Sequence, residues 1–224
     1  KINEIEDKKT ILHIFNTKYV LDNNNLNNLP IGLFGNFYSH ELSFFLIDSN
    51  DYKNLDNLFL QCNLKVKKIL SKSFIEGSII INNNTDFETF AKVEIGQNHS
   101  KIFLFENAAL KFFENFEFGT NMILNDISKI TGLNKEVLED ILKSPDFCNH
   151  KIQDEIIDQK FFKSKNFRKI KKKLILDIAN ARIEEMAEII FSKNINFSNL
   201  KAKIKLPVFL NIREKFNISC FKKD

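Results

Sequence analysis

Two features of the sequence carry groups that can hold an anion. Gly119-Thr120 opens a helical pattern, and the free backbone N–H groups at a helix start can lie near a phosphate, although a glycine there is also ordinary turn chemistry. Residues 168–173 read Arg-Lys-Ile-Lys-Lys-Lys. Such a run contacts an acidic partner through complementary charge or, more commonly, forms a solvated face.

The charge is unevenly divided along the 224 residues. Residues 151–224 hold 18 Lys/Arg against 9 Asp/Glu, whereas residues 1–150 hold 15 against 20. An acidic partner, a nucleic acid, a membrane surface or a Lys-rich solvated face would each account for this split. Only Arg168, Arg182 and Arg213 supply guanidinium groups, so the bidentate phosphate grip of nucleic-acid readers is scarce. We therefore expect no nucleic-acid partner.

Cysteine and histidine do not form a metal-type pattern in the sequence. The three cysteines are odd in number and scattered, which favours reduced thiols and a cytoplasmic location over a disulfide framework. No secretory leader and no run of about 18 apolar residues is visible. We predict no metal ligands among Cys62, Cys148, Cys220, His13, His40, His99 and His150.

The first half of the chain shows short β patterns between polar turns. Residues 11–21 alternate as in a strand, and the Asn-rich residues 22–28 predict a loop. A helix is expected over 51–63, with Asp51 as its N-cap. The other expected elements are a pair of strands within 32–48 around residues 38–40, a strand at 65–70 and a short helix at 71–81.

The second half predicts a strand meander followed by helices. β-like stretches at 91–96, 101–106 and 110–118 are separated by tight turns, which indicates an antiparallel meander. A helix should follow Gly119 and end before Gly132. The remaining expectations are a helix at 134–142, a loop or weak helix at 160–165, a long amphipathic helix at 167–191 and a buried strand at 206–210.

Three segments, read in order, carry a family resemblance. The first is ILHIFNTKYVLD at 11–22, followed by PIGLFG at 30–35. The second is KVEIGQNHSK at 92–101 with FEFGTNMILNDI at 116–127, and the third is IANARIEEM at 178–186. Together they resemble the FtsA family, the actin-like proteins that tether the bacterial division ring to the membrane.

The resemblance implies an α/β, actin-like (ribonuclease H-type) fold. The chain would hold the second lobe and part of the inserted subdomain of the first lobe. Residues 1–70 would be the later part of that subdomain and the return to the first lobe. Residues 71–145 would form the second-lobe core, and 146–224 its small subdomain with the start of a return strand. The family's first-lobe phosphate loop would lie upstream, and its membrane-targeting helix downstream.

The resemblance also implies a nucleotide site at the turn near residue 96. In the family, a glycine-rich hairpin holds phosphates with backbone N–H groups, which glycine allows by close backbone approach. This chain keeps Gly96 but has Gln97, Asn98, His99 and Ser100 after it, and Lys101 stands in place of an aspartate that helps arrange Mg²⁺. Lys101 would contact a phosphate directly, or the hairpin has lost its nucleotide. The implied ATP-binding residues are Gly96, Asn98, Ser100, Lys101, Gly119, Thr120 and Arg182, the last also readable as part of an exposed helix face.

The function implied is that of a cell division adaptor at the inner face of the cell membrane, at the division site. It would bind the acidic C-terminal tail of FtsZ, recruit later division proteins and self-associate as an actin-like polymer, with weak or absent ATPase activity and no assigned catalytic residue. The alternative is a pilus-assembly type protein or another actin-fold ATPase or kinase. The implied contacts for the tail are Arg168, Lys169, Lys171, Lys172 and Lys173.

Overall fold

The computed structural model describes residues 8–26, 28–84, 88–144, 147, 155–162, 167–197 and 206–212. The chain divides into two compact units, and the division passes through three strands of one sheet. Unit 1 comprises Lys1–Lys92 and Phe103–Phe113, and unit 2 comprises Val93–Ile102 and Glu114–Asp224. The division into residues 1–70, 71–145 and 146–224 that is expected from the sequence stays a prediction.

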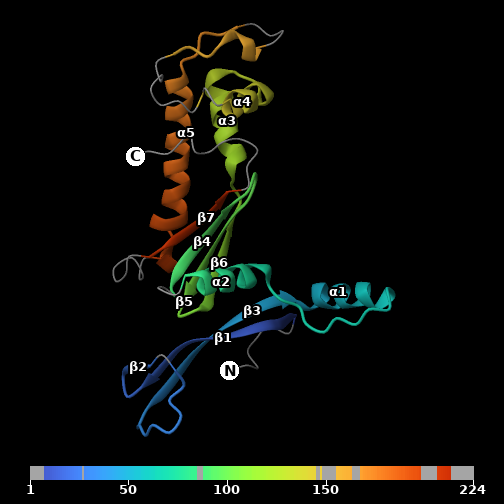
Figure 1. The fold of residues 1–224 in the computed structure, drawn as a ribbon, viewed down its shortest axis with the longest axis vertical. Helices are drawn as coiled ribbons and strands as arrows, with labels where there is room; N and C mark the ends of the chain where they lie inside the picture. The colour runs from blue at the N-terminus through green and yellow to red at the C-terminus, as the bar shows by residue number, and fades with distance from the viewer. Residues whose placement is uncertain are drawn as a thin grey trace. The chain divides into compact units, whose positions relative to one another are not determined.

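Unit 1 contains a three-stranded antiparallel sheet in the order β2-β1-β3 (Figure 1). Its strands are β1 (Lys9–Leu21), β2 (Asn24–Leu26) and β3 (Tyr38–Asp48). The strand expected at 11–21 is confirmed. The Asn-rich segment, expected to be all loop, instead makes a two-residue turn at Asp22 and Asn23, both with positive φ, and then the short β2.

The pair of strands expected within 32–48 is wrong, because only β3 forms there. The Asp22 carboxylate accepts the backbone N–H groups of Asn36 and Phe37 at 2.9 and 2.8 Å. The Asp22 side chain thereby holds the residues before β3 in a loop at the end of β1, so these residues do not pair as a strand.

Two helices follow in unit 1. Helix α1 (Ser49–Gln61) is capped by Asp48, whose carboxylate accepts the N–H of Asn50 at 2.9 Å, and not by Asp51 as predicted. The strand expected at 65–70 is wrong: these described residues are not in a strand. Helix α2 (Lys72–Asn83) confirms the expected short helix, and its Gly77 lies so close to the Phe105 ring that a Cβ would clash with it.

The predicted meander is confirmed as β4 (Phe90–Ile95), β5 (Ser100–Glu106) and β6 (Ala109–Phe116). The strand expected at 206–210 forms as β7 (Val208–Ile212), and the sheet order is β6-β5-β4-β7. The expectation that this strand is buried is wrong, because Val208 and Leu210 are exposed. Asn107 and Ala108 link β5 to β6 with positive φ at both positions, as a tight hairpin requires. The α/β class expected from the sequence is confirmed.

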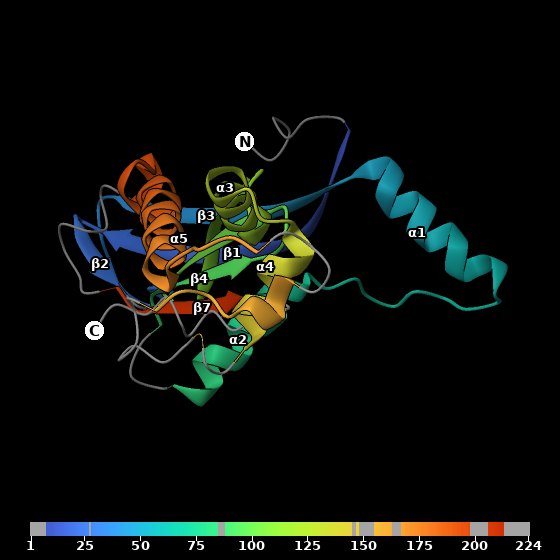
Figure 2. The ribbon, with the colours of Figure 1, turned by 90° about the horizontal axis from the view of Figure 1, so that it is seen from above.

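Unit 2 has a helical core formed by α3 (Thr120–Thr131), α4 (Lys135–Lys143) and α5 (Lys172–Ala187). Helices α3 and α5 lie side by side (Figures 1 and 2), and Ile127, Leu138 and Ile175 are fully buried in the core that they share. Helix α3 ends at Gly132, whose φ of 66° gives the predicted left-handed C-cap. The described part of unit 2 also contains a 3₁₀ turn (Gln159–Phe162) and a π-helical turn (Glu188–Ser192).

Helix α5 begins at Lys172 and not at residue 167, the start that the sequence suggests. The Ile157 N–H donates to the Ile170 carbonyl at 2.8 Å, and the Lys172 N–H donates to the Glu155 carbonyl at 2.9 Å. This extended pairing competes with helix formation until residue 172. Within the described residues, no helix combines the length and apolar character needed to cross a bilayer.

Candidate functional site

The turn between β4 and β5 lies against the start of α3. The Thr120 N–H donates to the Gly96 carbonyl at 3.0 Å, and the Asn121 N–H donates to the Gln97 carbonyl at 2.9 Å. The Met122 N–H donates to the Gly119 carbonyl at 3.0 Å. The first three amides of the helix, which are free at most helix starts, therefore all have backbone acceptors.

Gly119 permits this close approach. A Cβ on Gly119 would lie 2.6 Å from the carbonyl carbon and oxygen of Gln97, and closer still to the Gly96 oxygen. Backbone atoms cannot move away from such a contact as a flexible side chain can. The glycine that the sequence indicated as a helix start is thus required for packing the helix onto the hairpin.

The side chains of the hairpin divide into internal and external ones. Ser100 is fully buried, and its hydroxyl donates to the Phe118 carbonyl at 2.7 Å. Asn98 is exposed, and its side-chain oxygen accepts a hydrogen bond from the side-chain Nδ2 of Asn121 at 2.8 Å. Lys101 is exposed on β5. The structure therefore brings together Gly96, Asn98, Ser100, Gly119 and Thr120, which the sequence predicted as one site.

Arg182, also predicted for nucleotide binding, connects two helices. Its Nε donates to Asp126 of α3 at 2.5 Å, and its Nη1 donates to Glu185 at 2.5 Å. The hydrogen bond to Asp126 raises the pKa of the Arg182 guanidinium, with partial burial opposing the shift. Sequence reasoning missed Asp126 as the partner, because the two residues are far apart in the chain.

The basic residues predicted to bind a partner have different surroundings. Arg168 lies over Gly132 and donates to the Thr131 carbonyl at 3.2 Å, so it covers the end of α3. The Lys172 ammonium pairs with Glu155 at 3.1 Å, and only 12% of that lysine side chain is exposed. Lys169, Lys171 and Lys173 are exposed, so the predicted set does not form one free basic face.

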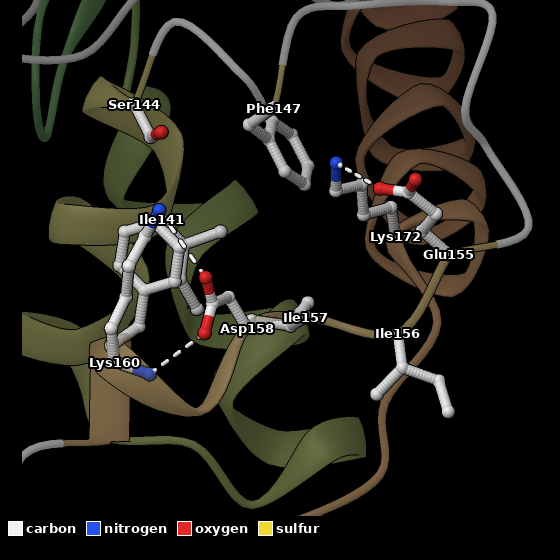
Figure 3. A pocket seen from close by; sticks show the side chains of 10 residues that line it. Ile141, Ser144, Phe147, Glu155, Ile156, Ile157, Asp158, Lys160 and Lys172 are labelled. Carbon is white, nitrogen blue, oxygen red and sulfur yellow. Dashed lines mark hydrogen bonds and ion pairs between the residues drawn. The ribbon is translucent and has the colours of Figure 1, made fainter.

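A small pocket of about 200 Å³ lies beside this basic segment (Figure 3). Ile141, Phe147 and Ile157 supply its apolar lining, and Lys172 and Glu155 form an ion pair at its rim. At the opposite side, Asp158 accepts the Lys160 N–H and pairs with its ammonium at 3.3 Å. The backbone hydrogen bond from Lys160 lowers the pKa of Asp158, more than its ammonium does.

Over the part of the chain that the structure describes, no group of three or more His, Cys, Asp or Glu side chains gathers as a metal ion would require. Cys62 is exposed and its thiol is free. Cys148, Cys220 and His150, which the sequence analysis named, lie outside the described residues.

Comparison with known proteins gives matches among solved structures alone. No family model and no curated protein matches the chain. The ethanolamine utilization protein EutJ from Carboxydothermus hydrogenoformans matches with a TM-score of 0.40 and 14% identity, over 61% of this chain and 40% of that one. MreB5 of Spiroplasma citri, bound to AMPPNP, matches with 0.43 and 10%, over 73% and 60%.

The PilM-PilN type IV pilus biogenesis complex matches with a TM-score of 0.40 and 7% identity, over 90% of this chain and 58% of that one. The chain thus spans between 40% and 60% of the length of these three structures.

Proposed function

We propose that this chain belongs to an actin-like adaptor of the FtsA type, which binds the acidic tail of FtsZ at the membrane and does not turn over ATP. One observation supports it above the others: the β4–β5 hairpin already accepts the backbone N–H groups at the start of α3, so these groups are not free to bind a phosphate. The carbonyl oxygens of Gly96 and Gln97 occupy the acceptor positions for Thr120 and Asn121. A phosphate bound at this helix start would have to accept hydrogen bonds from the same two N–H groups.

Side-chain chemistry at the hairpin supports the same proposal. The Ser100 hydroxyl is buried against Phe118 and faces away from solvent, so it is not available to a phosphate. Lys101 carries a positive charge where the resemblance places an Mg²⁺-arranging aspartate. Under this proposal ATP and Mg²⁺ are not required for the adaptor's binding function.

The proposed tail contacts follow from the exposure of the basic segment. Lys169 and Lys173 are exposed and flank the start of α5. An acidic peptide would gain charge-assisted contacts from them, and such contacts affect the association rate more than the final affinity. Arg168 and Lys172 have structural contacts and would contribute less. Self-association and a membrane link through further sequence are parts of the same proposal.

The test is a titration of a labelled FtsZ C-terminal peptide with this chain, followed by fluorescence anisotropy, with and without Mg-ATP. We expect saturable binding that ATP does not change. The double variant Lys169→Glu, Lys173→Glu should weaken it about tenfold, a change of about 1.4 kcal/mol. The matched control is Lys129→Glu, Lys135→Glu, which reverses two exposed lysines elsewhere in unit 2.

Two outcomes would overturn the proposal. One is peptide binding that is absent or that both double variants reduce equally. The other is clear ATP turnover by the chain, which would indicate an actin-fold ATPase in place of an adaptor. Circular dichroism of each variant checks that it is folded.

A further inference from the structure

The segment that joins α1 to α2 has a strand-like sequence but belongs to no strand. This return segment, residues 65–70, runs back from the end of α1 toward α2 (Figures 1 and 2). Within the described residues, no backbone hydrogen bond engages an N–H or C=O group of the return segment. Backbone N–H and C=O groups are obligatory hydrogen-bonding groups, so those of the return segment are left to solvent.

The return segment forms one wall of an apolar groove, and α1 forms the other. The groove has a volume of about 840 Å³, and its apolar lining comes from Leu55, Phe59, Leu64, Val66 and Ile69. No residue of α1 is buried, and the structure describes the whole helix. A 13-residue helix is marginal in water unless tertiary packing covers an apolar face, so an occupant of the groove would stabilise α1.

Three lysines complete the lining of the groove: Lys65, Lys67 and Lys68. All three side chains are exposed. Among the described residues, none of the three has an ion-pair partner. Negative charge on an occupant would therefore meet unpaired positive charge at the groove.

Both a membrane surface and an extended peptide would meet lysines beside apolar side chains, and the unpaired backbone distinguishes them. A bilayer offers no partner to the N–H and C=O groups of the return segment, and burying such groups in hydrocarbon costs free energy. A helical peptide uses its own backbone groups internally, so it would leave the segment unpaired as well. An extended peptide brings a matching row of donors and acceptors, as in peptides that add a strand to an exposed edge.

We propose that the groove binds an extended peptide that alternates acidic and apolar residues, and that this peptide pairs with the return segment as a strand. In a paired strand Lys65 and Lys67 lie on one face, where they meet the acidic side chains. Leu64 and Val66 lie on the other face, where they meet the apolar side chains. The proposal is independent of the proposed function, because the groove belongs to unit 1 and the contacts proposed for the FtsZ tail belong to unit 2.

The probe is a labelled eight-residue peptide that alternates glutamate and valine, titrated with this chain and followed by fluorescence anisotropy. A peptide that alternates lysine and valine is the control of opposite charge. We expect the wild type to bind the glutamate peptide about tenfold more tightly. The double variant Lys65→Glu, Lys67→Glu should reverse this preference. The matched control Lys8→Glu, Lys53→Glu, which reverses two exposed lysines of unit 1 outside the groove, should retain it.

Modified probes separate strand pairing from a purely electrostatic contact. Alternate N–H groups of a strand point to opposite edges, so N-methylation of one alternate set should abolish binding, whereas methylation of the other should change it by less than about twofold. Replacing the valines of the probe by serine should weaken binding about tenfold, because the groove is apolar. In NMR hydrogen-exchange experiments, the bound glutamate peptide should slow exchange at alternate amides of the return segment.

Several results would overturn the proposal. They are absence of binding, equal binding of the two peptides by the wild type, and equal effects of the two methylated sets. Binding to phosphatidylserine vesicles without peptide binding would assign the groove to a membrane, and self-association that Lys65→Glu, Lys67→Glu abolishes would assign it to a second copy. Either result contradicts the peptide site. Circular dichroism of each variant checks that it is folded.

Discussion

The backbone N–H of Thr120 donates to the carbonyl oxygen of Gly96 at 3.0 Å, which joins the first residue of α3 to the turn after β4. Two properties of the chain allow this bond. Gly119 has no side chain to hold the helix away, and the hairpin turn directs its carbonyl oxygens toward the helix. A helix start favours negative charge, and the partial negative charge of two carbonyl oxygens is already placed there.

Gly119→Ala should separate the helix from the hairpin. A Cβ would clash with the Gly96 and Gln97 carbonyl groups, and backbone at both sides would have to shift. We expect a loss of about 1–3 kcal/mol in the free energy of unfolding. The specific sign is faster hydrogen exchange at the Thr120 and Asn121 amides, measured by NMR.

Gly32→Ala is the control for that measurement. Gly32 has a positive φ of 81°, but a Cβ there meets nothing within 4 Å. The substitution adds backbone strain in the loop at residues 28–37 and should leave the exchange of the Thr120 and Asn121 backbone amides unchanged. Unchanged exchange in Gly119→Ala would mean that the hairpin does not protect these amides.

Ser100→Ala should affect stability and not nucleotide binding. The hydroxyl is fully buried and donates to the Phe118 carbonyl at 2.7 Å, so its removal leaves a buried acceptor without its donor. A loss of about 1–3 kcal/mol in unfolding free energy is expected from urea denaturation. Ser39→Ala, at an exposed position of β3, should change it by less than about 0.5 kcal/mol. A variant that is as stable as the wild type but loses fluorescent-ATP binding would restore Ser100 to a phosphate-binding role.

The sequence predicted best the elements whose signals are local. The meander follows from alternation and tight turns, and α3 follows from its apolar period with Gly119 and Gly132 at its ends. Each of these signals lies within the element or next to it. The same holds for α2 and α4, whose expected positions differ from the observed bounds by one or two residues.

The elements that sequence reasoning missed depend on distant residues. The Asp22 carboxylate holds Asn36 and Phe37, and this contact decides that residues 28–37 are a loop. The start of α5 is fixed by pairing between residues 155–157 and 170–172. Residues 65–70 have a strand pattern but are in no strand. Likewise, the family resemblance implies a nucleotide contact for Arg182, and its partner Asp126, on another helix, cannot be read from spacing.

Arg182 and Asp126 should be energetically coupled. Their side chains are 22% and 27% exposed and form a charge-assisted hydrogen bond between α3 and α5. A double-mutant cycle with Arg182→Ala and Asp126→Ala should give a coupling of about 0.5–1 kcal/mol, allowing for solvent screening. The more exposed Lys143–Glu139 pair is the control, with a coupling of about 0.3–0.5 kcal/mol that 1 M salt should largely remove. No coupling between Arg182 and Asp126 would return the arginine to the candidates for ligand binding.

Stability should fall as pH decreases below 6.5, because of His13. Burial among Phe15, Phe45 and Phe74 lowers the pKa of His13 below its usual 6.5, and the charge of Lys68 lowers it further. Its Nε2 accepts the N–H of Ser71, the N-cap of α2, at 2.9 Å, and only the neutral ring can do this.

The direction follows from the number of protons bound. Between the folded pKa and 6.5 the unfolded chain binds more protons at this histidine than the folded chain does, so stability rises with pH in that window. The contribution of neutral His13 to the free energy of unfolding is fully present above pH 6.5 and is lost as the pH falls through the folded pKa. The urea midpoint of the wild type, measured from pH 7.5 to 5, should therefore decrease more steeply than that of His13→Gln, which keeps an acceptor but does not titrate. Lys68→Ala should make the decrease smaller and end it at a higher pH, since it removes one cause of the lowered pKa and brings the folded pKa closer to 6.5. Parallel curves for the wild type and His13→Gln would show that another group controls the acid side of the stability profile.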